Sequence, residues 1–119
     1  PSRSANMKKK YYHQKLIRDK IPEKIKEAGG DYEVRILDGK EFEKELKKKL
    51  VEESKELSKA PKEELLNELA DVLELTKSIA SHFKIHFSKV EKFQEEKRDK
   101  RGAFKKKLFL VWSTGKAGK

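Results

Sequence analysis

The sequence predicts an all-α protein, an antiparallel four-helix-type bundle with a small accessory two-stranded β element. Three observations support this fold class. Apolar residues recur at three- and four-residue steps through the centre of the chain, which is the period of an amphipathic helix. Proline and glycine separate these stretches, as they do where helices begin and end. Charged residues make up 44% of the 119 residues, so the expected helices are highly charged on their outer faces.

The first expected elements are a short helix and a short strand. Pro22 suits the first turn of a helix, where its missing N–H is not needed, and residues 29–30, both glycine, supply a stop. Residues 32–37 alternate in type, as a half-buried strand does. Residues 108–112 are the expected second strand and pair with them.

Three longer helices follow. The second is expected over residues 40–59 and ends before Pro61, because the residue preceding a proline disfavours helical backbone. The third is expected over residues 62–83 and the fourth over residues 88–101, where Gly102 ends it. Since the break at Pro61 is short, the second and third helices should form an antiparallel hairpin. The second helix has an apolar face of Phe42, Leu46, Leu50 and Leu57, and the third a broad stripe of Leu65, Leu66, Leu69, Val72, Leu73, Thr76, Ile79, Ala80 and Phe83.

The length predicts one domain, which we place at residues 15–112. Residues 1–6 precede the only methionine, Met7, and resemble a cloning remnant. They join the basic residues after them in an N-terminal segment, residues 1–14, and residues 113–119 are expected to be a flexible tail. The absence of cysteine excludes disulfides and thiolate metal sites. No apolar run is long enough to span a bilayer and no secretory segment is evident, so we expect a cytoplasmic protein without a membrane partner.

The strongest functional signal is a pair of carboxylate clusters on either side of the expected hairpin turn. Glu53 and Glu56 are three residues apart, as are Glu68 and Asp71, so each pair projects from one side of its helix. Glu68 falls inside the apolar arc of its helix, where an unpaired carboxylate is strongly unfavourable. Lys49 can pair with one carboxylate but cannot neutralise four. A solvated helix face is the alternative, but Mg²⁺, or Mn²⁺ in its place, explains the cluster better.

Lys97 and Arg101 form a basic element near the end of the fourth helix, where they share one face. Cations at this end of a helix complement its dipole, which is the simpler explanation. Beside a site of several carboxylates and a metal ion, the same side chains would hold the phosphates of a nucleotide. The net charge of +10 also favours an anionic partner.

The order of these motifs resembles the all-α nucleoside triphosphate pyrophosphohydrolase superfamily, which includes MazG proteins, dimeric dUTPases and phosphoribosyl-ATP pyrophosphohydrolases. Its acidic signature corresponds to Glu-Glu-x-x-Glu at residues 52–56 and Glu-x-x-Asp at residues 68–71. Its Lys-rich helix with a following Arg-Gly-Gly-Phe is similar to residues 97–104, although Ala103 replaces the second glycine. The opening at residues 15–22 is similar to a compact MazG-like subgroup that is often labelled phosphoribosyl-ATP pyrophosphohydrolase-like.

The resemblance implies a Mg²⁺-dependent enzyme that cleaves the α–β phosphoanhydride of nucleoside triphosphates, or of a related nucleotide, to a monophosphate and pyrophosphate. Cleaning of the nucleotide pool is the expected role, and a homodimer or dimer of dimers the expected assembly. Carried over by position, the metal ligands are Glu53, Glu56, Glu68 and Asp71, the catalytic residues are Glu52 and Glu53, and the phosphate or nucleotide binders are Lys97, Arg101, Arg18 and Lys20. Glu52 would be a further ligand or would deprotonate the attacking water.

Two alternatives stay open. One is a phosphoribosyl-ATP pyrophosphohydrolase of histidine biosynthesis, which rests on the subgroup label alone. The other is a non-enzymatic, basic, nucleic-acid-binding helical protein, supported by the net charge and by lysine clusters at residues 8–10 and 105–107. No helix-turn-helix or other reader motif is present, and this function leaves Glu68 in an apolar stripe unexplained. Nucleic acid is therefore the less favoured partner.

Overall fold

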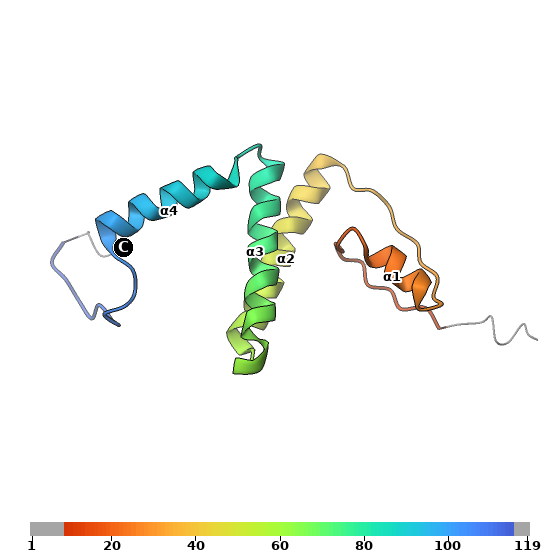
Figure 1. Ribbon diagram of the computed structural model, residues 1–119, viewed down its shortest axis with the longest axis horizontal. Coiled ribbons are helices and arrows are strands. Elements are labelled where there is room, and N and C mark those ends of the chain that lie inside the picture. The colour runs from red at the N-terminus through yellow and green to blue at the C-terminus, as the bar shows by residue number, and fades with distance from the viewer. Residues whose placement is uncertain (1–8, 116–119) are drawn as a thin grey trace, which may run out of the picture.

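A computed structural model describes residues 9–115 of the chain. Within this part, all the regular secondary structure is helical (Figure 1), and it comprises α1 (Ile21–Glu27), α2 (Gly39–Lys59), the short 3-10 helix η2 (Lys62–Glu64), α3 (Leu65–His82) and α4 (Phe87–Arg101). The predicted all-α class is confirmed. Each of the four expected helices forms close to its expected bounds, because periodicity and the proline and glycine stops act locally.

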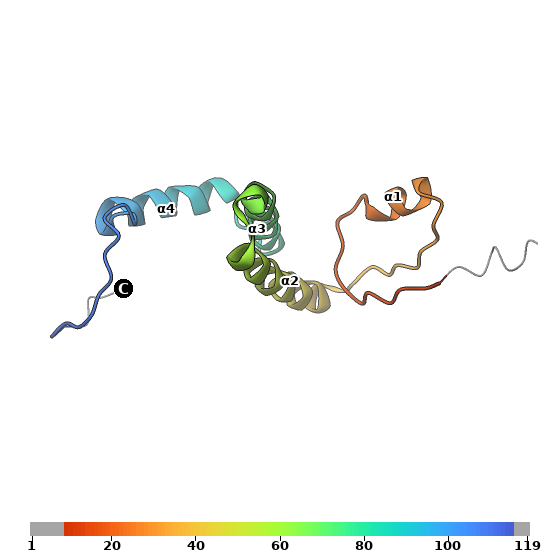
Figure 2. The same ribbon diagram turned by 90° about the horizontal axis from the view of Figure 1, so that it is seen from below.

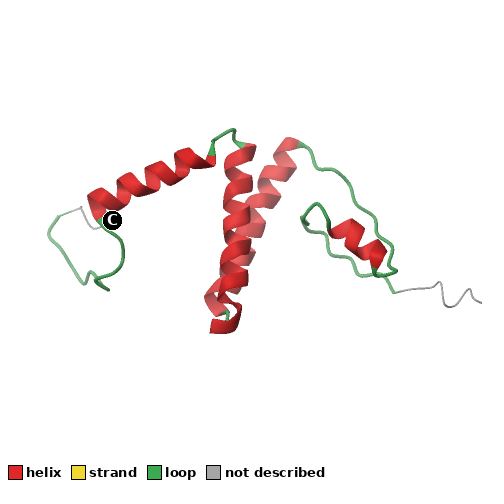
Figure 3. Cartoon of the chain, viewed as in Figure 1, coloured by secondary structure: helices red, strands yellow, loops and turns green. Residues whose placement is uncertain are grey.

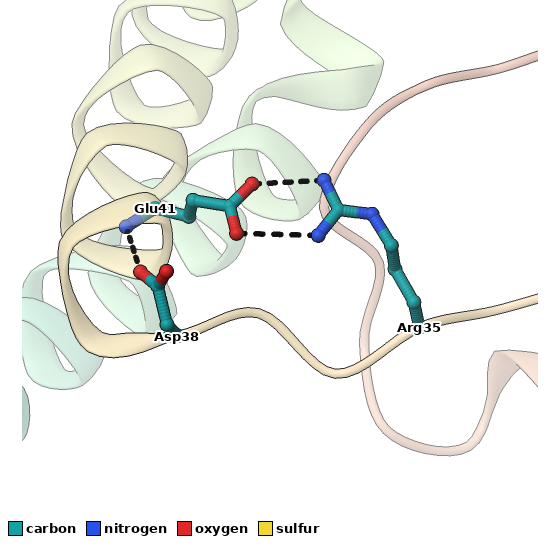
Figure 4. A network of polar contacts seen from close by, with 3 residues as sticks. All are labelled: Arg35, Asp38 and Glu41. Carbon is teal, nitrogen blue, oxygen red and sulfur yellow. Dashed lines mark hydrogen bonds and ion pairs between the residues drawn. The ribbon is translucent and has the colours of Figure 1, made fainter.

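Specific side chains mark the beginning of α2. Asp38 Oδ1 accepts a hydrogen bond from the backbone N–H of Glu41 at 2.9 Å, which satisfies one of the free donors of the first helical turn. The Arg35 guanidinium donates two hydrogen bonds to the Glu41 carboxylate, at 2.8 and 3.2 Å (Figure 4). At the other end of α2, Ala60 has extended backbone ahead of Pro61, as the sequence predicts.

The main tertiary contact of the molecule is an antiparallel hairpin of α2 and α3 (Figures 1 and 2). Leu46 of α2 and Leu75 and Ala80 of α3 are the apolar side chains that become buried in residues 9–115. One seam of α3 faces α2, while other apolar residues of the broad stripe stay exposed. The hairpin therefore places the two carboxylate clusters across a thin core.

The predicted four-helix-type bundle does not form within one chain. α1 packs against no other helix of the described part, and α4 contacts only the end of α3 from which it projects. The two helices extend on opposite sides of the hairpin (Figure 1), and the molecule measures 76 × 34 × 23 Å. Packing requires an apolar stripe. α1 has only seven residues, and α4 is charged on nearly all sides, so neither offers enough apolar surface to dock.

The predicted accessory β element is wrong. Residues 32–37 and 108–112 have no regular secondary structure, and residues 9–115 contain no strand (Figure 3). The two segments lie on opposite sides of the hairpin, one before α2 and the other after α4. A strand needs a partner about 4.8 Å away, whereas alternation in the sequence reports only which side chains could share a face. Neither segment has such a partner among residues 9–115.

The predicted boundaries fall partly outside the described residues. This applies to residues 1–8, which include the expected cloning remnant, and to residues 116–119 of the expected tail. Among the helices that the structure describes, none combines the length and the apolar character needed to cross a membrane.

Candidate metal centre

The predicted carboxylates lie at the closed end of the hairpin, near the α2–α3 connection. Glu53 and Glu56 belong to the last two turns of α2, and Glu68 and Asp71 to the first two turns of α3. Because the helices run antiparallel and η2 joins them directly, both pairs stand near the same end of the molecule. The hairpin is thus the element that converts two sequence motifs into one cluster.

Three of the four carboxylates converge. One oxygen atom from each of Glu53, Glu56 and Glu68 lies within 4.8 Å of the other two. Oxygen ligands sit about 2.1 Å from Mg²⁺, so ligands on opposite sides of the ion are about 4.2 Å apart. The three oxygens therefore need only small side-chain adjustments to share one cation. We call Glu53, Glu56 and Glu68 the carboxylate triad.

Glu68 is the most unusual member of the triad, because it is a charged residue that is only 9% exposed. Within residues 9–115, the Oε2 atoms of Glu68 and Glu53 are both buried and accept no hydrogen bond. Buried polar atoms are nearly always satisfied, and an orphaned carboxylate oxygen is costly. These two oxygens fit the oxygen-rich environment that a divalent cation requires.

The electrostatics of the triad are those of carboxylates held too close together. The pKa of the Glu53 carboxyl is raised, first by desolvation and then by the negative charges of Glu56 and Asp71, while Lys49 opposes the rise. Burial likewise raises the pKa of Glu68, and Glu56 and Asp71 add to the effect. Both shifts mean that the cluster favours an added positive charge, either a proton or a metal ion.

Asp71, the fourth predicted ligand, is engaged by an arginine instead. Arg18 Nη2 lies 2.7 Å from Asp71 Oδ1 and donates a hydrogen bond to it. Arg18 belongs to the loop before α1, so this ion pair joins residues 53 positions apart in the chain. The sequence grouped Asp71 with the metal ligands and Arg18 with the phosphate binders, and the structure brings the two side chains together at the edge of the triad.

Two further predicted residues, Glu52 and Lys20, are not part of the triad. Glu52 is exposed on α2, next to Glu53 in the chain. Lys20 is exposed at the start of α1, and in the described part its side chain makes no hydrogen bond or ion pair with the carboxylates. The catalytic role of Glu52 and the phosphate-binding role of Lys20 therefore stay predictions from the sequence motif.

The predicted phosphate binders of α4 are not brought to the triad of their own chain. α4 begins at the end of α3 opposite the α2–α3 connection and runs away from the hairpin (Figure 1). Lys97 and Arg101 lie toward its far end and are exposed. The ammonium group of Lys97 lies 5.1 Å from the centre of the Phe93 ring, a cation–π contact within α4.

Asn67 is a neighbour of the triad that the sequence analysis did not identify. Its side chain amide opposes the rise in the pKa of the Glu68 carboxyl. The sequence feature that could have identified Asn67 is its position, because this neutral amide directly precedes Glu68, the glutamate that falls in the apolar arc of α3. Asn67 therefore belongs to the electrostatic surroundings of Glu68.

Two shallow surface hollows lie near the opposite end of α3, away from the triad. Residues 77–87 supply most of their lining, and Phe42 and Glu74 contribute to one of them. Neither hollow contains a residue of the triad or Asp71, so they do not define the candidate site.

Comparisons of the chain with protein-family models, with curated proteins and with solved structures found no match. The chemical capacity of the site therefore has to follow from its own residues. A triad of carboxylates with two buried oxygens that lack a hydrogen-bond partner in residues 9–115 suits a hard divalent cation.

Proposed function

We propose that the protein is a Mg²⁺-dependent nucleotide pyrophosphohydrolase. It would hydrolyse the α–β phosphoanhydride of nucleoside triphosphates, or of a related nucleotide, in cleaning of the nucleotide pool. One observation carries the proposal: the nine-tenths-buried Glu68 has an oxygen with no hydrogen-bond partner in residues 9–115 and lies close to Glu53 and Glu56 across the hairpin. A solvated acidic face, the ordinary explanation for surface glutamates, does not account for a carboxylate inside the apolar seam. The motif order that resembles the all-α pyrophosphohydrolases supports the same function.

In this proposal the triad holds the cation, and neighbouring groups act on water and phosphate. A bound Mg²⁺ supplies neutralisation of phosphate charge and a lower pKa for the attacking water. Glu53, whose Oε2 atom has no partner in residues 9–115, would orient that water. Glu52, exposed beside it, would accept the proton once the water lies within hydrogen-bond reach.

A second copy of the chain completes the site in this proposal. α3 has a second apolar stripe at three- and four-residue steps, and α2 leaves it uncovered: Leu66, Leu69 and Leu73 are 82%, 53% and 47% exposed. Two hairpins packed through this stripe would form the four-helix core that one chain lacks. The projecting α4 of one copy would then carry Lys97 and Arg101 toward the triad of the other, where they would hold the substrate phosphates.

Pyrophosphate release from a panel of nucleotides, with and without Mg²⁺, tests the proposal. The panel should include ribo- and deoxyribonucleoside triphosphates, oxidised forms and phosphoribosyl-ATP, since phosphates are recognised by charge but the base and sugar by pocket shape. We expect Mg²⁺-dependent release that Glu68→Gln abolishes and Glu74→Gln retains, because Glu74 is an exposed glutamate of the same helix outside the triad. Undiminished release by Glu53→Gln and Glu68→Gln would exclude the triad as the catalytic centre.

One observation favours a second function, the binding of single-stranded nucleic acid. Residues 104–112 combine three lysines with exposed aromatic side chains, of which Phe104, Phe109 and Trp112 are 97%, 90% and 77% exposed. Basic segments with stacking aromatics bind single strands with little sequence preference. A gel shift with random DNA and RNA at several salt concentrations tests this function. Tight binding with a steep salt dependence, together with no nucleotide hydrolysis, would favour it.

A further inference from the structure

Arg18 connects the N-terminal part of the chain to the candidate metal centre. Its contact with Asp71 is the one hydrogen bond or ion pair between residues 9–20 and the hairpin in the part of the chain that the structure describes. α1, which begins three residues after Arg18, packs against no other described helix. We define residues 9–38 as the N-terminal arm. Arg35 pairs with Glu41 in the first turn of α2, where the arm continues into the hairpin, whereas the Arg18–Asp71 pair joins the start of the arm to α3.

The same ion pair occupies an oxygen that the metal centre could use. Asp71 lies on α3 three residues, or nearly one turn, after Glu68, and its charge acts on both Glu53 and Glu68 of the triad. In the described part of the chain, Glu68 and Glu53 each have a buried oxygen without a hydrogen-bond partner. The cluster can therefore bind a cation in addition to the one positive charge that Arg18 supplies. Of the triad and Asp71, Asp71 alone forms an ion pair within residues 9–115.

We propose that Arg18 is a latch that exchanges Asp71 for phosphate when a divalent cation binds. Without the cation, the guanidinium neutralises Asp71 and holds the N-terminal arm on the hairpin. A cation shared by the triad and Asp71 displaces Arg18, frees the arm and leaves the guanidinium available to an anionic ligand. This inference rests on the proposed function for the existence of the metal site.

The chemistry of both partners fits this exchange. A planar guanidinium presents the same fork of donors to a carboxylate and to a phosphate, so Arg18 can change partners without losing charge-assisted hydrogen bonds. The pair is open to solvent, with side chains 56% and 31% exposed, so exchange requires no opening of the core. Coupling between two binding events is reciprocal: if the cation weakens the ion pair, the ion pair must weaken binding of the cation.

Calorimetric titration of the full chain with Mn²⁺ tests the coupling directly. Arg18→Ala should bind Mn²⁺ about two- to fivefold more tightly than the wild type. This factor corresponds to the free energy of an exposed ion pair, which the cation no longer has to break. The Mn²⁺ affinity of Arg18→Lys should lie between those of Arg18→Ala and the wild type. Arg35→Ala is the matched control, because it removes the same cation from another exposed ion pair, with Glu41, away from the triad. Its Mn²⁺ affinity should equal that of the wild type.

A distance measurement tests release of the arm without any need for activity. The chain has no cysteine, so spin labels can be placed at Glu23→Cys on α1 and Lys62→Cys at the hairpin connection, both exposed positions. Diamagnetic Mg²⁺ is used here to avoid relaxation of the labels. We expect a narrow distance distribution in EDTA that broadens with Mg²⁺, and a broad distribution under both conditions in the Arg18→Ala background.

The outcomes separate failure of the latch from failure of the metal site. The latch is overturned if Arg18→Ala binds Mn²⁺ no more tightly than the wild type, or if Mg²⁺ binds but leaves the distance distribution unchanged. If wild type and Glu68→Gln alike bind no Mn²⁺, the metal site is overturned and the latch with it. Thermal unfolding in EDTA verifies that each variant is folded before titration.

Discussion

Glu53 and Glu68 extend toward one another from adjacent helices, with ligand oxygens within 4.8 Å, and the Oε2 atom of each is buried without a partner in the described part of the chain. Two negative charges this close destabilise the fold unless a proton or a cation neutralises them. The cluster therefore links stability to cation binding, and this link leads to the first two predictions.

Glu68→Gln should raise the melting temperature of the protein in EDTA and abolish the further rise that Mg²⁺ gives the wild type. The amide removes a buried charge and its repulsion with Glu53 and Glu56, but it also removes a ligand. Differential scanning fluorimetry in EDTA and in Mg²⁺ measures both effects. The control Glu74→Gln should behave as wild type does. A lower melting temperature for Glu68→Gln in EDTA would show that this carboxylate stabilises the metal-free fold.

The raised pKa values of Glu53 and Glu68 predict a pH dependence of stability in EDTA. In the folded protein these carboxyls keep their protons at a higher pH than in the unfolded chain, where the ordinary value is 4.5. The folded state then binds more protons, so the free energy of unfolding decreases as pH rises from about 4.5 through the raised folded values, and stays reduced above them.

Chemical denaturation between pH 4 and pH 8 would measure this dependence. Glu53→Gln/Glu68→Gln should lack the decrease, and saturating Mg²⁺ should reverse it at neutral pH, because protons and the cation compete for the same oxygens. The prediction is contradicted if the free energy of unfolding changes with pH in the wild type as it does in the double variant.

Leu69→Glu should convert the proposed homodimer to a monomer. Leu69 lies in the exposed apolar stripe of α3 and is 53% exposed, so a charge there leaves the hairpin core intact but is buried when two stripes meet. Sedimentation equilibrium should show the molecular mass falling by half. Val51→Glu on α2 is the control, because Val51 has a similar exposure of 54% but lies outside the stripe. An unchanged mass for Leu69→Glu would place the interface elsewhere.

Mixing two inactive variants should restore activity if α4 serves the triad of a second copy. Lys97→Ala/Arg101→Ala lacks the phosphate binders and Glu68→Gln lacks a ligand, so each alone should release no pyrophosphate. In a mixed dimer, one site combines an intact triad with an intact α4. After random exchange of subunits, about one quarter of wild-type activity is expected, because half the dimers are mixed and each has one complete site.

Pyrophosphate release after co-refolding the two variants measures this recovery. Co-refolding either variant with itself is the control. Activity that stays absent from a mixture shown to contain mixed dimers would mean that α4 does not act in trans.

The sequence by itself determined the helices and the main part of the candidate site. Periodicity and the proline and glycine stops located α2, α3 and α4, because these signals act within a few residues. The same local geometry predicted that Glu68 lies inside an apolar arc, and the short break at Pro61 predicted a hairpin that would bring it to Glu53 and Glu56. All of these inferences concern residues on one helix or on two helices joined by a short turn.

Tertiary structure alone decided what the distant segments contact. No local pattern predicts that Arg18 holds Asp71, since the two are 53 positions apart. The expected strands at residues 32–37 and 108–112 were wrong for the same reason, because a strand depends on a distant partner. Local periodicity specifies which side chains share a face, whereas the partner of that face depends on how the whole chain buries its apolar surface. A chain with so little of that surface on α1 and α4 leaves both of them outside the core.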